Sequence, residues 1–146
     1  MEKYNTEIIQ LYQEANSFGE LLGMKLKLVE PGRIEYSMEV NQLHLATPSA
    51  AHGGAVAALV DAALGVAALS KVSIDKKVVS TIEFKVNYLK PALLGDILTA
   101  IGVVESAGNR ILYVECTVVN QRGITIAKAN GTFNAYPASK AFGREF

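Results

Sequence analysis

The chain contains no tryptophan, one cysteine and two histidines among its 146 residues. The lone Cys116 lies in an apolar, alternating stretch and has no partner for an internal disulfide, which is typical of a buried, unreactive thiol in a reducing compartment. His44, His52 and Asp61 lack the spacing and the fourth donor of a zinc site. We therefore predict no bound metal and no catalytic role for Cys116.

An excess of charge is also absent, because 14 Lys and Arg residues balance 14 Asp and Glu residues. This balance argues against nucleic acid as a partner, and no polybasic segment points to an anionic membrane. The first residues, Met1–Glu7, carry acids where a signal peptide would be basic, and no apolar stretch follows them. We expect a cytoplasmic protein that works without a cofactor.

The main feature of the sequence is a long segment with almost no charged residues. Between Leu43 and Ser70 the only ionisable residues are His44, His52 and Asp61, and the segment 55–69 combines good helix formers with small side chains on every face. This pattern predicts a helix that is buried all round. It favours a core helix over a membrane span, because a carboxylate lies at its centre.

The start of this helix and its single acidic residue indicate a catalytic site. His52-Gly53-Gly54 precedes the helix, where backbone N–H groups lack partners and the helix dipole favours negative charge, and Asp61 follows two turns later. An isolated Asp in an apolar helix is more often a structural residue that bonds a loop backbone. The combination of N–H donors and a potential base in one cleft favours acyl chemistry.

The flanking segments predict one α+β domain over residues 1–146. A helical period covers about residues 5–18, a hairpin turns at Pro31-Gly32, and the chain after residue 137 looks loose. Short turns join the later strands, so these strands should be antiparallel neighbours. We expect about six strands that curve around the helix. The four strands after the helix are expected at Val78–Leu89, Asp96–Glu105, Arg110–Asn120 and Ile124–Tyr136.

This order of elements resembles the hotdog fold, and the motifs resemble those of the phenylacetate-pathway (PaaI-like) acyl-CoA thioesterases. The resemblance runs from about Leu22 to Tyr136. It rests on His44-Leu45, His52-Gly53-Gly54, Leu59-Val60-Asp61 with Ala63 and Gly65, the segment Ser80–Ala92, Gly95-Asp96 and Ala127–Phe133.

The resemblance implies a role for each matching residue. Asp61 would act as general base or nucleophile on the thioester, and the Gly53 N–H would bind its carbonyl oxygen. His52 would shape that pocket, and Thr81 would hold the hydrolytic water. Sites in this family are shared between two subunits, which implies a homodimer or a homotetramer.

One position departs from the family pattern. Family members usually carry Asn six residues before the motif's histidine, where this chain has Ala46. Ser49 or Thr47 are the candidate replacements for the lost amide. Strand alternation also places Thr81 on the face opposite Ile82, so we expect Thr81 just before the regular strand.

The remaining candidates concern the substrate. Gly54, Ser49, Ala46 and Lys90 are the predicted substrate-binding residues. Lys90 would meet the phosphates of coenzyme A, as Arg110 and Lys128 would, although basic residues at strand ends are usually solvated. Tyr88 and Phe84 are expected in the core rather than in an acyl pocket.

The leading function is therefore hydrolysis of an acyl-CoA thioester. A non-catalytic acyl-CoA binding module is the main alternative, because Ala46 removes a polar group and leaves the pocket. A hydratase or dehydratase on the same fold is a further alternative, but glycines between His52 and Asp61 favour carbonyl activation. The strand Val78–Leu89 should form an open sheet edge that a homodimer would cover.

Overall fold

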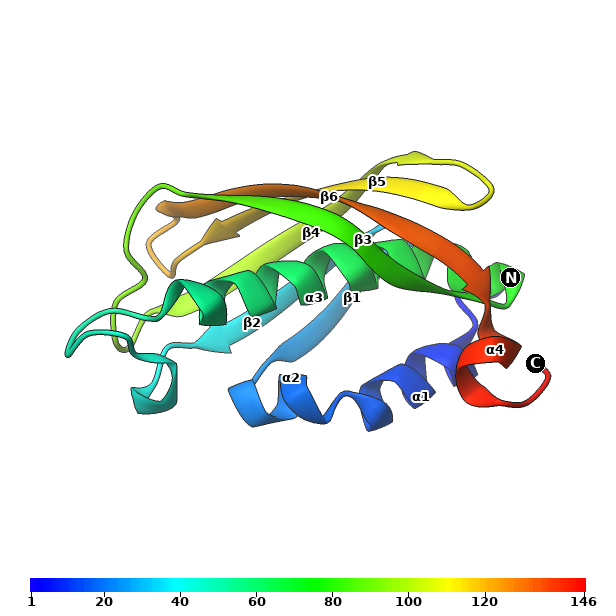
Figure 1. The fold of residues 1–146 in the computed structure, drawn as a ribbon, viewed down its shortest axis with the longest axis horizontal. Helices are drawn as coiled ribbons and strands as arrows, with labels where there is room; N and C mark the ends of the chain where they lie inside the picture. The colour runs from blue at the N-terminus through cyan, green and yellow to red at the C-terminus, as the bar shows by residue number, and fades with distance from the viewer.

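The computed structural model describes all 146 residues. Its main feature is one six-stranded antiparallel sheet that curves over a long helix (Figure 1). The strand order is β1-β2-β4-β5-β6-β3. This architecture confirms the predicted sheet, and β3 lies at its edge as expected. The strands are β1 Lys25–Glu30, β2 Arg33–Glu39, β3 Lys77–Tyr88, β4 Ile97–Ala107, β5 Ile111–Val119 and β6 Thr125–Pro137.

The long helix, α3 (Gly53–Val72), packs into the concave face of the sheet. Close approach requires small residues: a Cβ on Gly102 of β4 would lie 2.4 Å from the backbone oxygen of Ala63. Helix 53–75 is long and apolar enough to cross a membrane, but 67% of its most apolar window is buried in the protein, so it is a core helix.

The expectation that α3 is buried all round is wrong for the single chain. Ala58, Asp61, Ala62 and Gly65 form a strip along the helix that remains partly exposed. The sheet wraps the opposite side of α3, and only short helices from the two ends of the chain approach this strip (Figure 1). The strip therefore faces a cavity instead of the core.

The N-terminal segment forms two helices where the helical period predicted one. These are α1 (Thr6–Ala15) and α2 (Ser17–Leu22). Asn16 separates them, because its side chain accepts a hydrogen bond from the Gly19 N–H and so caps α2. Gly23, with φ of 77°, ends α2 in the left-handed conformation that favours glycine.

The chain after residue 137, for which we expected loose structure, forms α4 (Ala138–Phe142). Ala138 is fully buried and packs with Ile8 and Leu69 in a small second cluster. The two ends of the chain lie at the same end of the molecule (Figure 1). Two short 3-10 helices, η1 (Gln42–His44) and η2 (Ser73–Asp75), precede and follow α3.

Candidate active site

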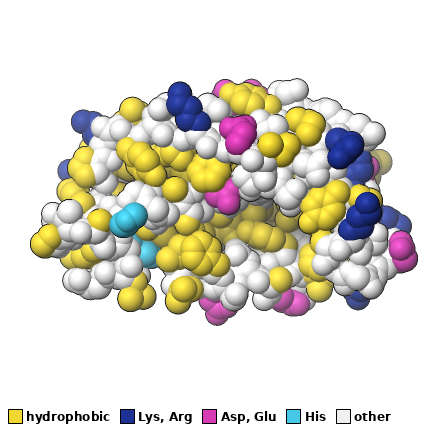
Figure 2. Space-filling model, viewed as in Figure 1, with side chains coloured by type: hydrophobic (Ala, Val, Ile, Leu, Met, Phe, Trp, Pro, Cys, Tyr) yellow, Lys and Arg dark blue, Asp and Glu magenta, His cyan; other side chains and the backbone are white.

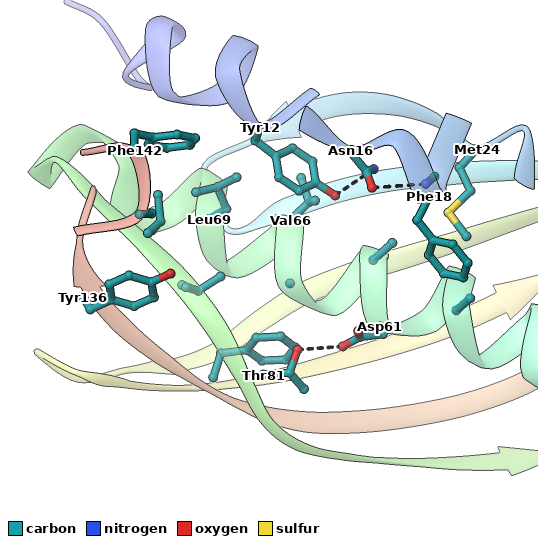
Figure 3. A pocket seen from close by; sticks show the side chains of 18 residues that line it. Tyr12, Asn16, Phe18, Met24, Asp61, Val66, Leu69, Thr81, Tyr136 and Phe142 are labelled. Atoms are coloured by element: carbon teal, nitrogen blue, oxygen red, sulfur yellow. Dashed lines mark hydrogen bonds between the residues drawn. The ribbon is translucent and has the colours of Figure 1, made fainter. Parts of the chain in front are cut away.

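Asp61 and Thr81 form the central pair of the candidate site. The Thr81 hydroxyl donates a hydrogen bond of 2.8 Å to Oδ1 of Asp61, and both side chains point into the same cavity (Figure 3). Asp61 lies on the partly exposed strip of α3, and Thr81 lies on the exposed edge strand β3. The pair is therefore accessible, and no protein donor occupies Oδ2 of Asp61.

A β-bulge gives Thr81 this direction. The pairing of β3 with β6 shifts register between Thr81 and Glu83, so that Ile82 is the extra residue. Alternation on either side of the bulge then puts Thr81 on the same face as Phe84 and Val86, which pack against the core. The expectation that Thr81 precedes the strand is wrong: it lies inside β3.

The cavity at Asp61 has a volume of about 340 Å³ and a mainly apolar lining. It lies between α3 and β3 on one side and the terminal helices on the other. In the space-filling view, hydrophobic side chains line a hollow between these elements (Figure 2). Its walls include Phe18, Val66, Leu69, Tyr136 and Phe142. Such a cavity suits an apolar acyl group.

A polar cluster at the cavity wall was not predicted from the sequence. Nδ2 of Asn16 lies 3.2 Å from the Tyr12 hydroxyl and 3.3 Å from the Tyr36 hydroxyl. Burial raises the pKa of Tyr12 far above its usual range, and the nearby Tyr36 and Asp61 raise it further. Tyr12 therefore stays neutral.

The start of α3 holds the second group of candidates. His52 caps the helix, since its Nδ1 accepts the Gly54 N–H at 2.8 Å. The Gly53 N–H donates to no group of the chain, as expected for the first residue of a helix. Tyr88 donates its hydroxyl hydrogen to the Gly53 carbonyl oxygen at 2.7 Å. Tyr88 is 52% exposed, so the expectation that it lies in the core is wrong.

A second cavity, also of about 340 Å³, opens at this helix start. Gly53, Tyr88 and Lys90 line it together, so the structure brings the predicted substrate-binding Lys90 beside the predicted oxyanion donor. Arg110 lies elsewhere, directly before β5 and beside Asn134. This second cavity does not include Asp61.

The two groups of candidates do not meet within one chain. Asp61 follows Gly53 by just over two helical turns, which corresponds to about 12 Å at 1.5 Å per residue. Asp61 and Thr81 line the first cavity, whereas Gly53 lines the second. The expectation of one cleft for donor and base is therefore wrong for a single subunit, because the helix rise separates the two groups.

The loop before α3 carries the position that departs from the family pattern. Ala46 is exposed, and its N–H donates to Ala50 O in a tight turn. The Thr47 hydroxyl accepts the Ala50 N–H, and the Ser49 carbonyl accepts the Leu94 N–H. The Ser49 hydroxyl makes no hydrogen bond, so it remains the freer of the two candidate replacements.

Two other sequence candidates have structural roles. His44 is buried and links η1 to the end of α2, since its Nδ1 accepts the Asn41 N–H and its Nε2 donates to Leu22 O. Cys116 is buried in the core, and burial raises the pKa of its thiol to about 12. An inert thiol is the consequence.

Comparisons with known proteins identify the family of this chain. The family model of the thioesterase superfamily matches residues 49–127, the segment that holds the helix start, Asp61 and Thr81. The curated Archaeoglobus fulgidus protein named "Putative esterase" is 30% identical over 113 residues, which cover 77% of this chain and 71% of that protein.

Solved structures show the same fold. The Escherichia coli PaaI protein from the phenylacetic acid degradation operon matches with a TM-score of 0.82 and 23% identity, over 89% of this chain and 91% of that chain. A Streptococcus mutans protein solved with acetyl-CoA matches with a TM-score of 0.71 and 29% identity, over 78% of this chain and 89% of that chain. The fold, the family model and the curated relative together show that this chain belongs to the thioesterase superfamily and has the hotdog fold.

Proposed function

We propose that the protein hydrolyses acyl-CoA thioesters, with Asp61 as general base or nucleophile. The observation that carries this proposal is the Asp61–Thr81 hydrogen bond inside a mainly apolar cavity. The solved relative with bound acetyl-CoA supports coenzyme A as the carrier. The acyl group would occupy the cavity beside Asp61, and the thioester carbonyl would lie near the carboxylate.

The pair suits activation of a water molecule. Thr81 donates to Oδ1 of Asp61, which fixes the carboxylate, while the lone pairs of the Thr81 oxygen stay available to accept from water. Oδ2 takes a proton as the water oxygen attacks the carbonyl carbon. When the tetrahedral intermediate collapses, the C–S bond breaks and the thiolate of coenzyme A recovers that proton. In the nucleophilic variant, Oδ2 itself attacks the carbonyl carbon, the C–S bond breaks and coenzyme A leaves as the thiolate. Water then hydrolyses the mixed anhydride on Asp61, which releases the free acid and restores the carboxylate.

The developing negative charge needs a donor, and the Gly53 N–H is the one we propose. It lies at the positive end of α3 and is free. Because about 12 Å separates it from Asp61 in one chain, we propose that the donor comes from a second subunit. His52 and Gly54 hydrogen-bond each other at this helix start, and we assign them to the shape of the donor site. Lys90 lines the cavity beside Gly53 and is the candidate contact for the phosphates of coenzyme A.

The edge strand β3 supports this assembly. It has twelve residues, no proline and large exposed apolar side chains at Ile82 and Tyr88. Such an edge is a pairing liability that a second copy removes. We propose a homodimer or a homotetramer in the cytoplasm, where the free Cys116 would stay reduced.

The test is thiol release from a panel of aromatic, short-chain and long-chain acyl-CoAs. Wild-type protein should release coenzyme A from at least one of them. Asp61→Asn should lower kcat by roughly two to four decades, because Asn keeps the shape and removes the ionisable oxygen. Equal turnover by Asp61→Asn would overturn the role of Asp61. With an enoyl-CoA as an additional substrate, loss of enoyl absorbance without thiol release would indicate a hydratase.

A non-catalytic acyl-CoA binding module is the second candidate, and Ala46 is the observation that favours it. The family's amide is missing there, and the loop places no other side-chain amide between residues 45 and 51. Binding of an acyl-CoA by calorimetry, with no thiol release from any member of the panel, would support this candidate.

A further inference from the structure

The Gly53–Gly54 peptide plane is held from both sides. Its carbonyl oxygen, on Gly53, accepts the Tyr88 hydroxyl hydrogen at 2.7 Å, and its N–H, on Gly54, donates to Nδ1 of His52 at 2.8 Å. In a trans peptide these two groups point in opposite directions. Two bonds from opposite sides therefore fix the rotation of the plane.

The two glycines fit closely around the same two rings. A Cβ on Gly54 would lie 2.9 Å from Nδ1 of His52, and a Cβ on Gly53 would lie 3.4 Å from the Tyr88 ring. Glycine has more backbone freedom than any other residue, so this pair would be the least ordered part of α3 without external restraint. The rings of His52 and Tyr88 supply that restraint.

The neighbouring N–H is the one that stays free. The Gly53 N–H belongs to the preceding peptide plane and donates to no group of the chain. Its direction depends on the backbone torsions of Gly53, which the held plane limits. Tyr88 comes from the end of β3, so this contact ties the helix start to the strand that also carries Thr81.

We propose that Tyr88 is a positioning residue, which orients the Gly53 N–H toward the thioester carbonyl by holding the Gly53–Gly54 peptide plane against His52. This inference rests on the proposed function, since it assigns Gly53 as the oxyanion donor. A hydrogen bond to developing charge depends steeply on geometry, so the effect of Tyr88 falls on the chemical step and not on substrate affinity.

The test is Tyr88→Phe, which removes one oxygen and keeps the ring. We expect kcat to fall about tenfold while KM and the melting temperature stay within experimental error. Tyr113→Phe is the matched control, because the Tyr113 hydroxyl bonds Glu115 on the outer face of the sheet; this variant should keep wild-type kcat. A raised KM at unchanged kcat would overturn the proposal in favour of a ligand contact, and unchanged kinetics would also overturn it.

A double variant tests the shared plane. If His52 and Tyr88 hold one peptide, His52→Ala with Tyr88→Phe should lose little more kcat than the worse single variant. Multiplied losses would contradict the shared restraint. Amide exchange gives a readout independent of activity: the Gly54 N–H should exchange faster in Tyr88→Phe, and equal exchange would count against the restraint.

The activities of wild-type protein, Asp61→Asn and Tyr88→Phe distinguish failure of the proposed function from failure of the role of Tyr88. Wild-type hydrolysis that Asp61→Asn abolishes and Tyr88→Phe leaves intact would overturn only the role of Tyr88. A wild-type protein that hydrolyses no acyl-CoA would overturn the proposed function, and amide exchange would still decide whether Tyr88 holds the Gly53–Gly54 peptide.

Discussion

The Thr81 hydroxyl donates to Oδ1 of Asp61 at 2.8 Å, and the bulge at Ile82 turns Thr81 toward α3. Without the extra residue, Thr81 would share a face with the outward side chains of β3. The bulge therefore builds the pair, and the edge position of β3 keeps it accessible. Bulges beside active sites commonly redirect one side chain in this way.

Thr81→Val should reduce kcat by about tenfold, because Val keeps the branched shape and loses both the hydrogen bond to Asp61 and the contact to water. Thr81→Ser should retain most of the activity. Thr117→Val on the outward face of β5 is the control and should keep wild-type kcat. Steady-state thiol release measures all three, and full activity in Thr81→Val would remove Thr81 from the mechanism.

Asn16→Ala should destabilise the fold by about 2 kcal/mol, since it removes the cap of α2 together with the bonds to Tyr12 and Tyr36. Asn5→Ala removes only the cap of α1 and should cost about 1 kcal/mol. Urea unfolding compares the two. Equal losses would show that the polar cluster adds no stability.

Cys116 should resist thiol reagents in the folded protein at pH 8, because burial raises the pKa of its thiol to about 12. The raised pKa of the thiol in the folded state also determines how stability changes with pH. Below the unfolded value of about 8.5 both states keep the proton and stability is unaffected. Stability falls as pH rises from there toward 12. Cys116→Ser should flatten this alkaline fall, and an unchanged fall would assign it to another group.

Ala46→Asn should raise kcat/KM about tenfold if the missing amide limits the rate, because a donor near the carbonyl strengthens charge stabilisation. Ser49→Ala is its partner: if the free Ser49 hydroxyl has taken over that role, this variant should lower kcat/KM. Both are assayed on the best substrate of the panel. No effect from either would remove residues 46–49 from the chemistry.

The fold followed from patterns that are local in sequence. Alternation predicted the strands and their order along the chain, and turn residues such as Pro31-Gly32 separated them. The break at Asn16 escaped prediction because the apolar period continues through it, and the side-chain cap becomes visible only when its bond to Gly19 is seen.

The site was predictable in its residues more than in their arrangement. The sequence pattern identified Gly53 as the candidate oxyanion donor and Asp61 as the candidate base. Their proximity in sequence suggested one cleft, but the rise of the helix keeps them apart. Regular strand alternation placed Thr81 on the outward face of β3, but the bulge at Ile82 shifts the alternation by one residue and places Thr81 on the inward face. Tyr88 carried no signal, because an aromatic residue in a strand most often belongs to the core.

In the proposed site, Asp61 of one subunit works with the Gly53 N–H of another. Gly53→Pro removes that N–H and adds a ring, whose Cβ would lie 3.4 Å from the Tyr88 ring, an ordinary contact distance. Proline is well tolerated at the first position of a helix, and His52, with ψ of 136°, already has the extended conformation that a following proline requires. Circular dichroism and the melting temperature should confirm that Gly53→Pro and Asp61→Asn both fold.

The decisive measurement is thiol release by an assembly purified through two different tags, one on Gly53→Pro and one on Asp61→Asn. Each variant alone should be inactive. In a shared-site dimer of the two variants, one site contains both substitutions and the other contains the native Asp61 and the native Gly53. About half of the wild-type kcat per dimer should therefore return. A two-tag assembly as inactive as its parents would contradict the shared site.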